Sequence, residues 1–192
     1  MSLNNFLLQI MSKVYMLVAE GFECVETLAP IDVLHRAGVQ VIRVAVSSDL
    51  SVVSSHNLMR LECDVLLADV DMSDGDALIL PGGNPGYINL GASEGVRAAV
   101  RDFYGSGRIV AAICGAPTVL ALADVARGAN ITCHSSVVSR MEGYDYHREG
   151  VVEYGNLITA AGAGRSIEFA LAIARRLVGS DTIAAVCQGM EL

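Results

Sequence analysis

One cysteine of this 192-residue chain lies where a nucleophile is expected. Cys114 directly follows the apolar run 109–113, and Gly115 and an Ala- and Leu-rich segment over 118–123 come after it. This order is typical of a nucleophile elbow, the sharp strand-to-helix turn that lifts a side chain above a sheet. Free N–H groups at the helix start favour a thiolate, the form that attacks electrophiles. Cys114 is therefore a candidate nucleophile or oxidation-sensing thiolate, and the alternative is an inert buried cysteine.

A glycine-rich turn is the second candidate element. Gly82 and Gly83 follow the apolar run 77–80 and Pro81. Adjacent glycines let the backbone approach a ligand and present N–H groups to it, so these two residues and Gly115 predict an oxyanion hole. The turn has neither the GKS/T nor the GxGxxG pattern of phosphate-binding loops. An ordinary tight turn is the alternative.

Acidic residues and one histidine complete the candidate set. Glu20, Glu23 and Glu26 lie at the expected start of the first helix, where acids often serve only as partners of the helix dipole. A carboxylate beside a thiolate would be partly protonated, because like charges disfavour joint ionisation, and it would then be able to move protons. His134 lies near another expected strand end and is a candidate base or orienting residue, with a structural role as the alternative.

The elements that must position these residues follow from the apolar pattern. Near-continuous apolar runs predict parallel strands covered on both faces, over 14–19, 39–46, 77–80 and 109–113. Amphipathic spacing predicts helices over 23–37, 96–103 and 167–177. Strands that alternate with helices predict an α/β fold, a doubly wound, mostly parallel sheet with helices on both faces. Its catalytic loops would gather at the carboxyl ends of the strands.

Two segments do not fit this alternation. The stretches 51–70 and 132–157 mix apolar residues with short polar breaks, and we expect them to form hairpins and loops at the periphery of the sheet.

The chain length fits one domain, which we place at 13–192. The segment 1–12 lacks the basic start and cleavage site of a signal peptide. It is expected to be a disordered or vector-derived leader, because a second Met-Ser pair at 11–12 directly precedes the first expected strand.

Composition excludes several classes of function. The net charge of −8 disfavours nucleic acid and anionic membranes as partners. No apolar stretch is long enough for a transmembrane helix. Five cysteines, an odd number without a CxxC pair, argue for free thiols in a reducing compartment, and we expect a cytoplasmic protein without a structural zinc site or other metal. Cys24, Cys63 and Cys187 lack an elbow context and are expected to be structural.

From Lys13 onward, the chain resembles the ThiJ/PfpI superfamily, and within it the branch of the Parkinson-disease protein (DJ-one). The matching segments are AEGFECVE at 19–26, PIDVLHRAG at 30–38, LPGG at 80–83, AIC at 112–114, TCH at 132–134 and IEFAL at 167–171. The resemblance implies a flavodoxin-like fold of the class I glutamine amidotransferase type, and usually a homodimer.

The resemblance also implies roles for site residues. Cys114 would be the reactive cysteine, prone to oxidation to the sulfinic acid, and Glu26 the protonated carboxylate beside it. His134 would line the same pocket. The N–H groups of Gly82, Gly83 and Gly115 would stabilise an oxyanion or an oxidised sulfur.

Members of this branch are described as cofactor-free glyoxalases, protein deglycases, chaperones and oxidative-stress sensors, and several carry a thiazole monophosphate biosynthesis label. We therefore predict a cofactor-independent enzyme that acts on α-oxoaldehydes or on glycated side chains, as a lyase or hydrolase of the glyoxalase III or deglycase type. Cys114 would form a hemithioacetal, Glu26 would relay the proton and His134 would assist. The alternative is a redox sensor or redox-regulated chaperone that uses Cys114 oxidation without turnover.

Three departures from the family pattern limit which properties of the family can be expected of this chain. Gly115 stands where the protease branch has a histidine, so a peptidase is not expected. Arg165 ends a Gly-Ala-Gly-Arg segment where the branch usually has Gly-Pro-Gly-Thr, and Ser135 replaces a common proline after the histidine. We expect the last two to reshape the mouth of the pocket.

Overall fold

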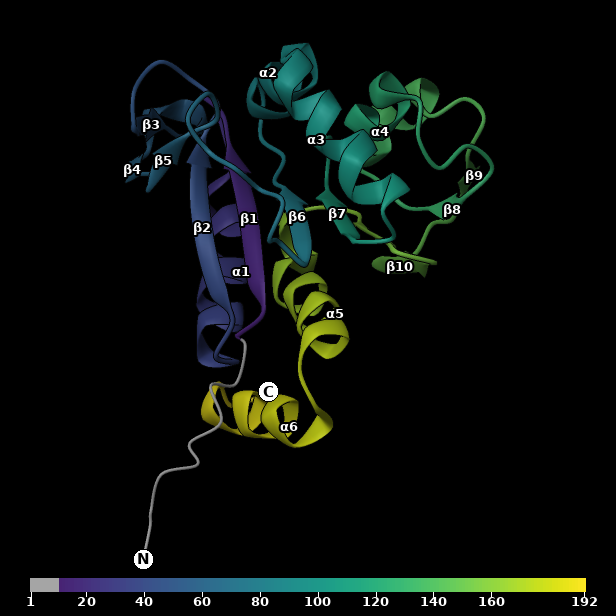
Figure 1. Ribbon diagram of the computed structural model, residues 1–192. Coiled ribbons are helices and arrows are strands. Elements are labelled where there is room, and N and C mark those ends of the chain that lie inside the picture. Colours follow the sequence, from purple (N-terminus) through teal and green to yellow (C-terminus); the bar gives the residue numbers. More distant parts are fainter. Residues whose placement is uncertain (1–10) are drawn as a thin grey trace, which may run out of the picture.

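The computed structural model describes residues 11–192, and most of the leader expected at 1–12 lies outside them. A seven-stranded sheet in the order β10-β11-β7-β6-β1-β2-β5 forms its centre (Figure 1). The strands are β1 (Lys13–Val18), β2 (Gln40–Ala45), β5 (Val65–Leu66), β6 (Ala77–Leu80), β7 (Ile109–Ile113), β10 (Val151–Tyr154) and β11 (Leu157–Ala160). All neighbouring pairs are parallel except β10 with β11. The predicted α/β fold with a mostly parallel sheet is confirmed.

Helices cover both faces of the sheet because its strands are apolar on both sides. Along β1, Val14, Met16 and Val18 face the core shared with three of the helices, whereas Tyr15 and Leu17 face the opposite core. The first layer holds α1 (Cys24–Arg36), α5 (Ser166–Leu177) and α6 (Ser180–Gly189). The second holds α2 (Gly86–Ala92), α3 (Glu94–Gly105) and α4 (Pro117–Ala123).

The expectation for the segments 51–70 and 132–157 is partly wrong. Strands β5 and β10 and the start of β11, all within them, join the central sheet, and β11 pairs directly with β7. These strands have two to four residues each, too few to show a period in the sequence. The remaining parts do form small additions, namely the hairpin of β3 (Ser51–Val53) with β4 (Arg60–Glu62), and β9 (Asp145–Tyr146), which pairs with β8 (Asn130–Ile131) just before the second segment. Short 3₁₀ turns are η1 (Ser55–Asn57), η2 (Ser135–Arg140) and η3 (Ala163–Arg165).

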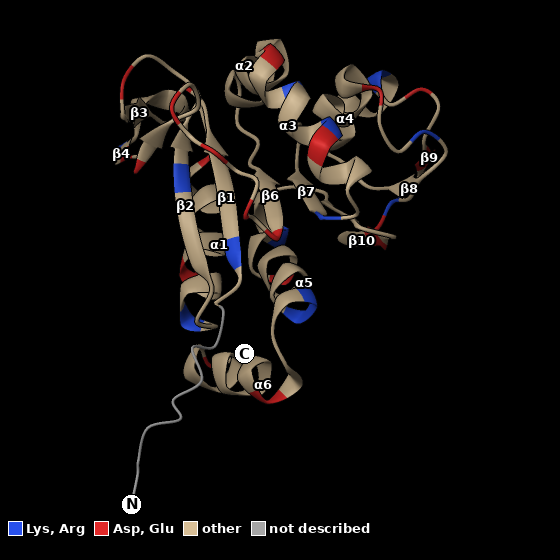
Figure 2. Cartoon of the chain, in the orientation of Figure 1, with Lys and Arg blue, Asp and Glu red and all other residues tan. Residues whose placement is uncertain are grey.

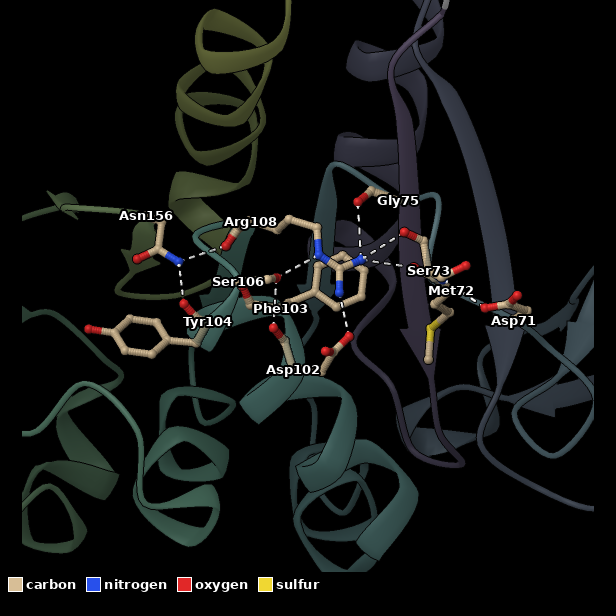
Figure 3. A network of polar contacts seen from close by, with 10 residues as sticks. All are labelled: Asp71, Met72, Ser73, Gly75, Asp102, Phe103, Tyr104, Ser106, Arg108 and Asn156. Atoms are coloured by element: carbon tan, nitrogen blue, oxygen red, sulfur yellow. Dashed lines mark hydrogen bonds and ion pairs between the residues drawn. The ribbon is translucent and has the colours of Figure 1, made fainter.

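A polar network anchors the amino end of β7, the strand that leads to Cys114 (Figure 3). Arg108 donates to the carbonyls of Met72 at 3.0 Å and Gly75 at 3.3 Å, and it forms an ion pair with Asp102. Its guanidinium carbon lies 3.8 Å from the centre of the Phe103 ring, within the range of a cation–π contact. The network fixes the start of the strand whose other end carries the cysteine.

Charged residues are spread over many elements of the described chain. Lys and Arg occur singly or in pairs on many elements, with acidic residues between them (Figure 2). Among residues 11–192, no helix has the length and apolar character needed to cross a membrane.

Candidate active site

Cys114 occupies the sharp turn that the sequence predicts between β7 and α4. Its φ of 66° lies in the left-handed region, which is unusual for a residue with a side chain and is enriched at functional sites. Two backbone hydrogen bonds hold this conformation. The Cys114 N–H donates to Ala160 O at 2.9 Å, and the His134 N–H donates to Cys114 O at 2.8 Å. Both β11 and the loop after β8 thus fix the cysteine.

Glu26 lies beside the cysteine, buried at the start of α1. Only 1% of this residue is exposed. Its Oε2 accepts a hydrogen bond of 2.9 Å from the Gly82 N–H, whereas Oε1 has no partner of normal hydrogen-bond geometry within residues 11–192. Glu23 caps the helix, since its carboxylate accepts from the Glu26 N–H at 2.7 Å. The structure therefore places Glu26 inward and leaves one of its oxygens free for a proton.

Gly82 separates Glu26 from Cys114. A Cβ atom at this position would lie 2.5 Å from Glu26 Oε2 and 2.7 Å from Cys114 Cβ, so only glycine lets the two side chains approach. The sequence predicts the Gly82 N–H as an oxyanion donor, but that group is already bound to Glu26. The expectation fails for this residue because the turn directs the N–H of Gly82 toward the helix.

Burial determines the protonation of Glu26. It raises the pKa of the carboxyl group from 4.5 to about 7, and the charge of Glu23 acts in the same direction. The Cys114 thiol and the N–H groups of Gly82 and Ala163 lower it by smaller amounts. Glu26 is consequently neutral in a large fraction of molecules near neutral pH, as the family resemblance implies.

The cysteine responds to the same environment. Burial and the Glu26 carboxylate raise the pKa of the Cys114 thiol to about 12, although the N–H groups of Gly115 and Gly83 lower it. The backbone N–H groups do favour the thiolate, as expected, but burial and the Glu26 carboxylate outweigh them. The thiolate becomes accessible when Glu26 carries the proton, because the repulsive charge is then gone. The pair holds two protons below about pH 7 and one above it, and that one can lie on the sulfur or on the carboxylate.

The cysteine opens into a small pocket of about 180 Å³. Cys114, Gly83, Gly115 and His134 line it, so four of the six predicted site residues meet there, with Glu26 and Gly82 directly behind the cysteine. His134 Nδ1 accepts the Ser136 N–H at 3.3 Å and lies 2.8 Å from Ser136 Oγ. In the neutral ring the proton is therefore on Nε2, which can donate to an oxygen atom in the pocket.

Sequence reasoning missed several pocket residues. Asn84, Tyr87, Ser136 and Val137 also line the pocket. Their positions shortly after Gly83 and His134 were the available signal, because residues that flank a predicted site residue often share its cavity. Glu23, one of the acidic candidates, lines the pocket as well. Tyr87 packs on Gly115, where a Cβ atom would lie 2.6 Å from its Cδ1.

Other candidates lie outside this arrangement. Glu20 accepts a hydrogen bond of 3.0 Å from the Val53 N–H and holds the β3–β4 hairpin. Cys63 is buried, and burial raises the pKa of its thiol to about 11. Cys24 and Cys187 are half-buried free thiols. Arg165 pairs with Glu168 at 3.2 Å and does not line the cysteine pocket. Within residues 11–192, no group of three His, Cys, Asp or Glu side chains is suited to hold a metal ion.

Known proteins share both the sequence and the fold. The model of the DJ-1/PfpI family matches residues 12–176. Protein dj-1beta of Drosophila melanogaster is 37% identical over 176 residues, which cover 91% of this chain and 94% of the relative. The glutathione-independent glyoxalase DJR-1.2 of Caenorhabditis elegans is 35% identical over 172 residues, with coverages of 88% and 90%. The crystal structure of Drosophila DJ-1beta superposes with a TM-score of 0.92 at 34% identity and covers 95% of this chain and 99% of the other. The chain therefore belongs to the DJ-1/PfpI family.

Proposed function

We propose that this protein is a cofactor-independent glyoxalase that converts α-oxoaldehydes such as methylglyoxal into 2-hydroxy acids. The observation that carries the proposal is the buried Glu26 carboxyl, which has one free oxygen and a pKa near 7 beside Cys114. An isomerisation of this kind needs a group that takes a proton from one carbon and returns it to the next. The relative named as a glutathione-independent glyoxalase is consistent with this chemistry.

The reaction begins with proton transfer from Cys114 to Glu26 and attack of the thiolate on the aldehyde carbon. The carboxyl group of Glu26 returns that proton to the new oxyanion and gives a neutral hemithioacetal. The N–H groups of Gly83 and Gly115, which already point at the sulfur, stabilise the oxyanion as it forms. The hemithioacetal leaves Glu26 ionised and ready to act as a base.

The second half moves one hydrogen between adjacent carbons. Glu26 removes the proton from the carbon bound to sulfur, which gives an enediolate, and returns it to the neighbouring carbon. The Nε2–H of His134 donates its proton to the enediolate oxygen, and Nε2 then takes the hydroxyl proton of the first carbon, whose oxygen becomes the thioester carbonyl. The product is a thioester of a 2-hydroxy acid, and water then cleaves its carbon–sulfur bond to release the acid and restore the thiol. No external oxidant or reductant is consumed.

The same chemistry extends to adducts that α-oxoaldehydes form with protein side chains, which is the deglycase form of this proposal. The pocket is open to solvent on the side of His134, whose side chain is exposed. A reduced Cys114 is required in both cases, so we expect the protein to act in a reducing compartment such as the cytoplasm.

A redox role is the second candidate function. Cys114 is partly exposed in its pocket, and a protonated Glu26 with a free oxygen is able to donate a hydrogen bond to a sulfinate. Two equivalents of peroxide would oxidise the thiol to the sulfinic acid and be reduced to water. In this case Cys114 would be oxidised by mild peroxide before Cys63 and Cys187, which mass spectrometry of peptides would detect.

We also propose a homodimer. Val25, Leu28 and Ile167 are 36–50% exposed at the amino ends of the contacting helices α1 and α5. Val25 and Ile167 border a hollow together with Leu171. A second copy of the chain on this face would bury the apolar side chains close to Glu26.

The test of the main proposal is lactate formation from methylglyoxal without glutathione. We expect Cys114→Ser and Glu26→Gln each to reduce kcat/KM by at least about a hundredfold, the usual scale for a lost nucleophile or general acid–base group. Cys187→Ser is the matched control and should retain wild-type turnover. Full activity of Cys114→Ser would refute the glyoxalase proposal, and absent turnover of the reduced wild type would favour the redox role.

A further inference from the structure

A larger hollow lies next to the cysteine pocket and is not used by the steps above. It is a groove of about 590 Å³ between α2 and α4, two helices that lie side by side over one face of the sheet (Figure 1). Tyr87 lines both the groove and the cysteine pocket. The short turn η2 also borders both, through Ser136 and Val137 in the pocket and Arg140 in the groove. The groove and the cysteine pocket are therefore adjacent, and Tyr87 and η2 border both.

The groove is lined mainly by apolar side chains that are exposed to solvent. Ile88 is 45% exposed and Leu122 is 59% exposed. Gly91 lets Leu122 lie close over α2, because a Cβ atom at this glycine would be 2.7 Å from Leu122 Cδ1. Removing exposed apolar side chains from water is favourable, by about 25 cal/mol per Å² of apolar surface that a ligand covers. An apolar ligand group would therefore be stabilised here.

Two arginines border the groove, and they differ in their contacts. Arg97 pairs with Glu94 at 2.6 Å, shares that carboxylate with Arg101 and donates to the Gly91 carbonyl, so its guanidinium is already engaged. The Arg140 side chain is exposed and makes no hydrogen bond or ion pair with any residue between 11 and 192. The groove thus combines apolar walls with an arginine that is available to a ligand, which favours an apolar group that carries an acid.

We infer that this groove holds the substituent of the α-oxoaldehyde while Cys114 binds its aldehyde carbon. The preferred substrates would then carry a large apolar substituent, and an acidic group on that substituent would add a contact with Arg140. The cysteine pocket of about 180 Å³ is below the usual size of a ligand site, whereas the groove of about 590 Å³ is within that range. The inference rests on the proposed glyoxalase function and leaves its steps unchanged, since the substituent does not react.

The experiment compares kcat/KM for methylglyoxal, phenylglyoxal and 4-carboxyphenylglyoxal through the hydroxy acid that each yields. For the wild type we expect phenylglyoxal to exceed methylglyoxal by about tenfold or more, the scale of one well-filled apolar pocket. The carboxylate should add about threefold, the scale of an exposed ion pair. Leu122→Ser should abolish most of the phenyl preference, and Arg140→Gln only the gain from the carboxylate.

Matched controls are Leu58→Ser and Arg60→Gln. Leu58 is 76% exposed, Arg60 is exposed, and both lie on the β3–β4 hairpin, outside the groove. Neither control should change the ratios between substrates. If the wild type turns over methylglyoxal without a preference for phenylglyoxal, or if Leu122→Ser leaves the preference intact, the inference is wrong although the proposed function stands.

A binding measurement separates the two proposals if no substrate is turned over. Mandelate and lactate are the hydroxy acids that correspond to phenylglyoxal and methylglyoxal, and each can be tested for protection of Cys114 against iodoacetamide. Stronger protection by mandelate, lost in Leu122→Ser, would support the groove as the site of the substituent even though the glyoxalase proposal had failed. Equal protection by the two acids would overturn the inference.

Discussion

At the scale of single residues, the site depends on the proton that Cys114 and Glu26 share. Glu26 is buried and Cys114 is half-buried, and their two negative charges would repel each other across the narrow space that Gly82 leaves open. The pair therefore holds a single proton above about pH 7. That state supplies either a thiol beside a carboxylate or a thiolate beside a carboxylic acid, and the proposed reaction uses both.

The raised pKa of Glu26 predicts a pH dependence of stability. The folded protein holds the proton up to about pH 7, whereas the unfolded chain releases it near pH 4.5. Between these values the native state binds more protons, so the free energy of unfolding falls as the pH rises. We expect the wild type to lose about 3 kcal/mol relative to Glu26→Gln between pH 4 and pH 8.

Urea denaturation of both proteins over this pH range measures the difference directly. Other titrating groups contribute equally to the two proteins, so the difference isolates Glu26. A constant difference between the two stability curves would show that Glu26 is ionised in the native state throughout, contrary to the burial argument.

At the scale of elements, β7 links the cysteine at one of its ends to a structural polar network at the other. Its carboxyl end carries Cys114, and its amino end is held by the contacts of Arg108 (Figure 3). The strand is buried along its whole length and pairs with β6 on one side and β11 on the other. The geometry of the elbow therefore depends on a strand that is fixed at both ends.

We predict that Arg108→Met destabilises the protein by about 3 kcal/mol. The change removes the donor for the carbonyls of Met72 and Gly75 and the partner of Asp102, and unpaired polar groups that are partly buried are costly. Thermal or urea unfolding measures the loss, with Arg60→Met as the control at an exposed site. A loss below about 0.5 kcal/mol, the range of ordinary surface substitutions, would show that the network is unimportant for stability.

At the scale of the whole molecule, the two helical layers offer different surfaces. The layer of α2, α3 and α4 carries the groove beside Tyr87, whereas the layer of α1 and α5 exposes the apolar side chains of Val25 and Ile167. Glu26 lies on α1, in the layer of α1 and α5, and only Gly82 separates its carboxylate from Cys114. Assembly through this layer would leave the groove accessible to substrate.

The homodimer proposal predicts a solution mass of twice that of the chain. Val25→Asp should convert the protein to a monomer, because it would place two carboxylates in an apolar interface. Light scattering after size-exclusion chromatography measures the mass, and Leu122→Asp on the other layer is the control. A monomeric wild type, or a Val25→Asp protein of unchanged mass, would refute the dimer through this face.

The sequence by itself determined the long central strands, the elbow and the candidate residues. Long apolar strands such as β1 and β7 are visible because burial on both faces demands continuous hydrophobic runs. Cys114 could be found because an elbow needs a strand, a small residue and a helix in immediate succession. The role of Glu26 came only from the family resemblance, since the period of an amphipathic helix does not say which carboxylate lies against a cysteine on another element.

Only the tertiary structure decided how these residues act on one another. It directs the Gly82 N–H to Glu26 instead of an oxyanion, because the orientation of a donor depends on the turn around it. It raises the pKa values of Cys114 and Glu26, since burial and the approach of two acids are long-range properties of the packed chain. It also adds β10 and β11 to the sheet and forms the groove beside Tyr87. Contacts between distant segments arise only when the chain is folded, and no local pattern encodes them.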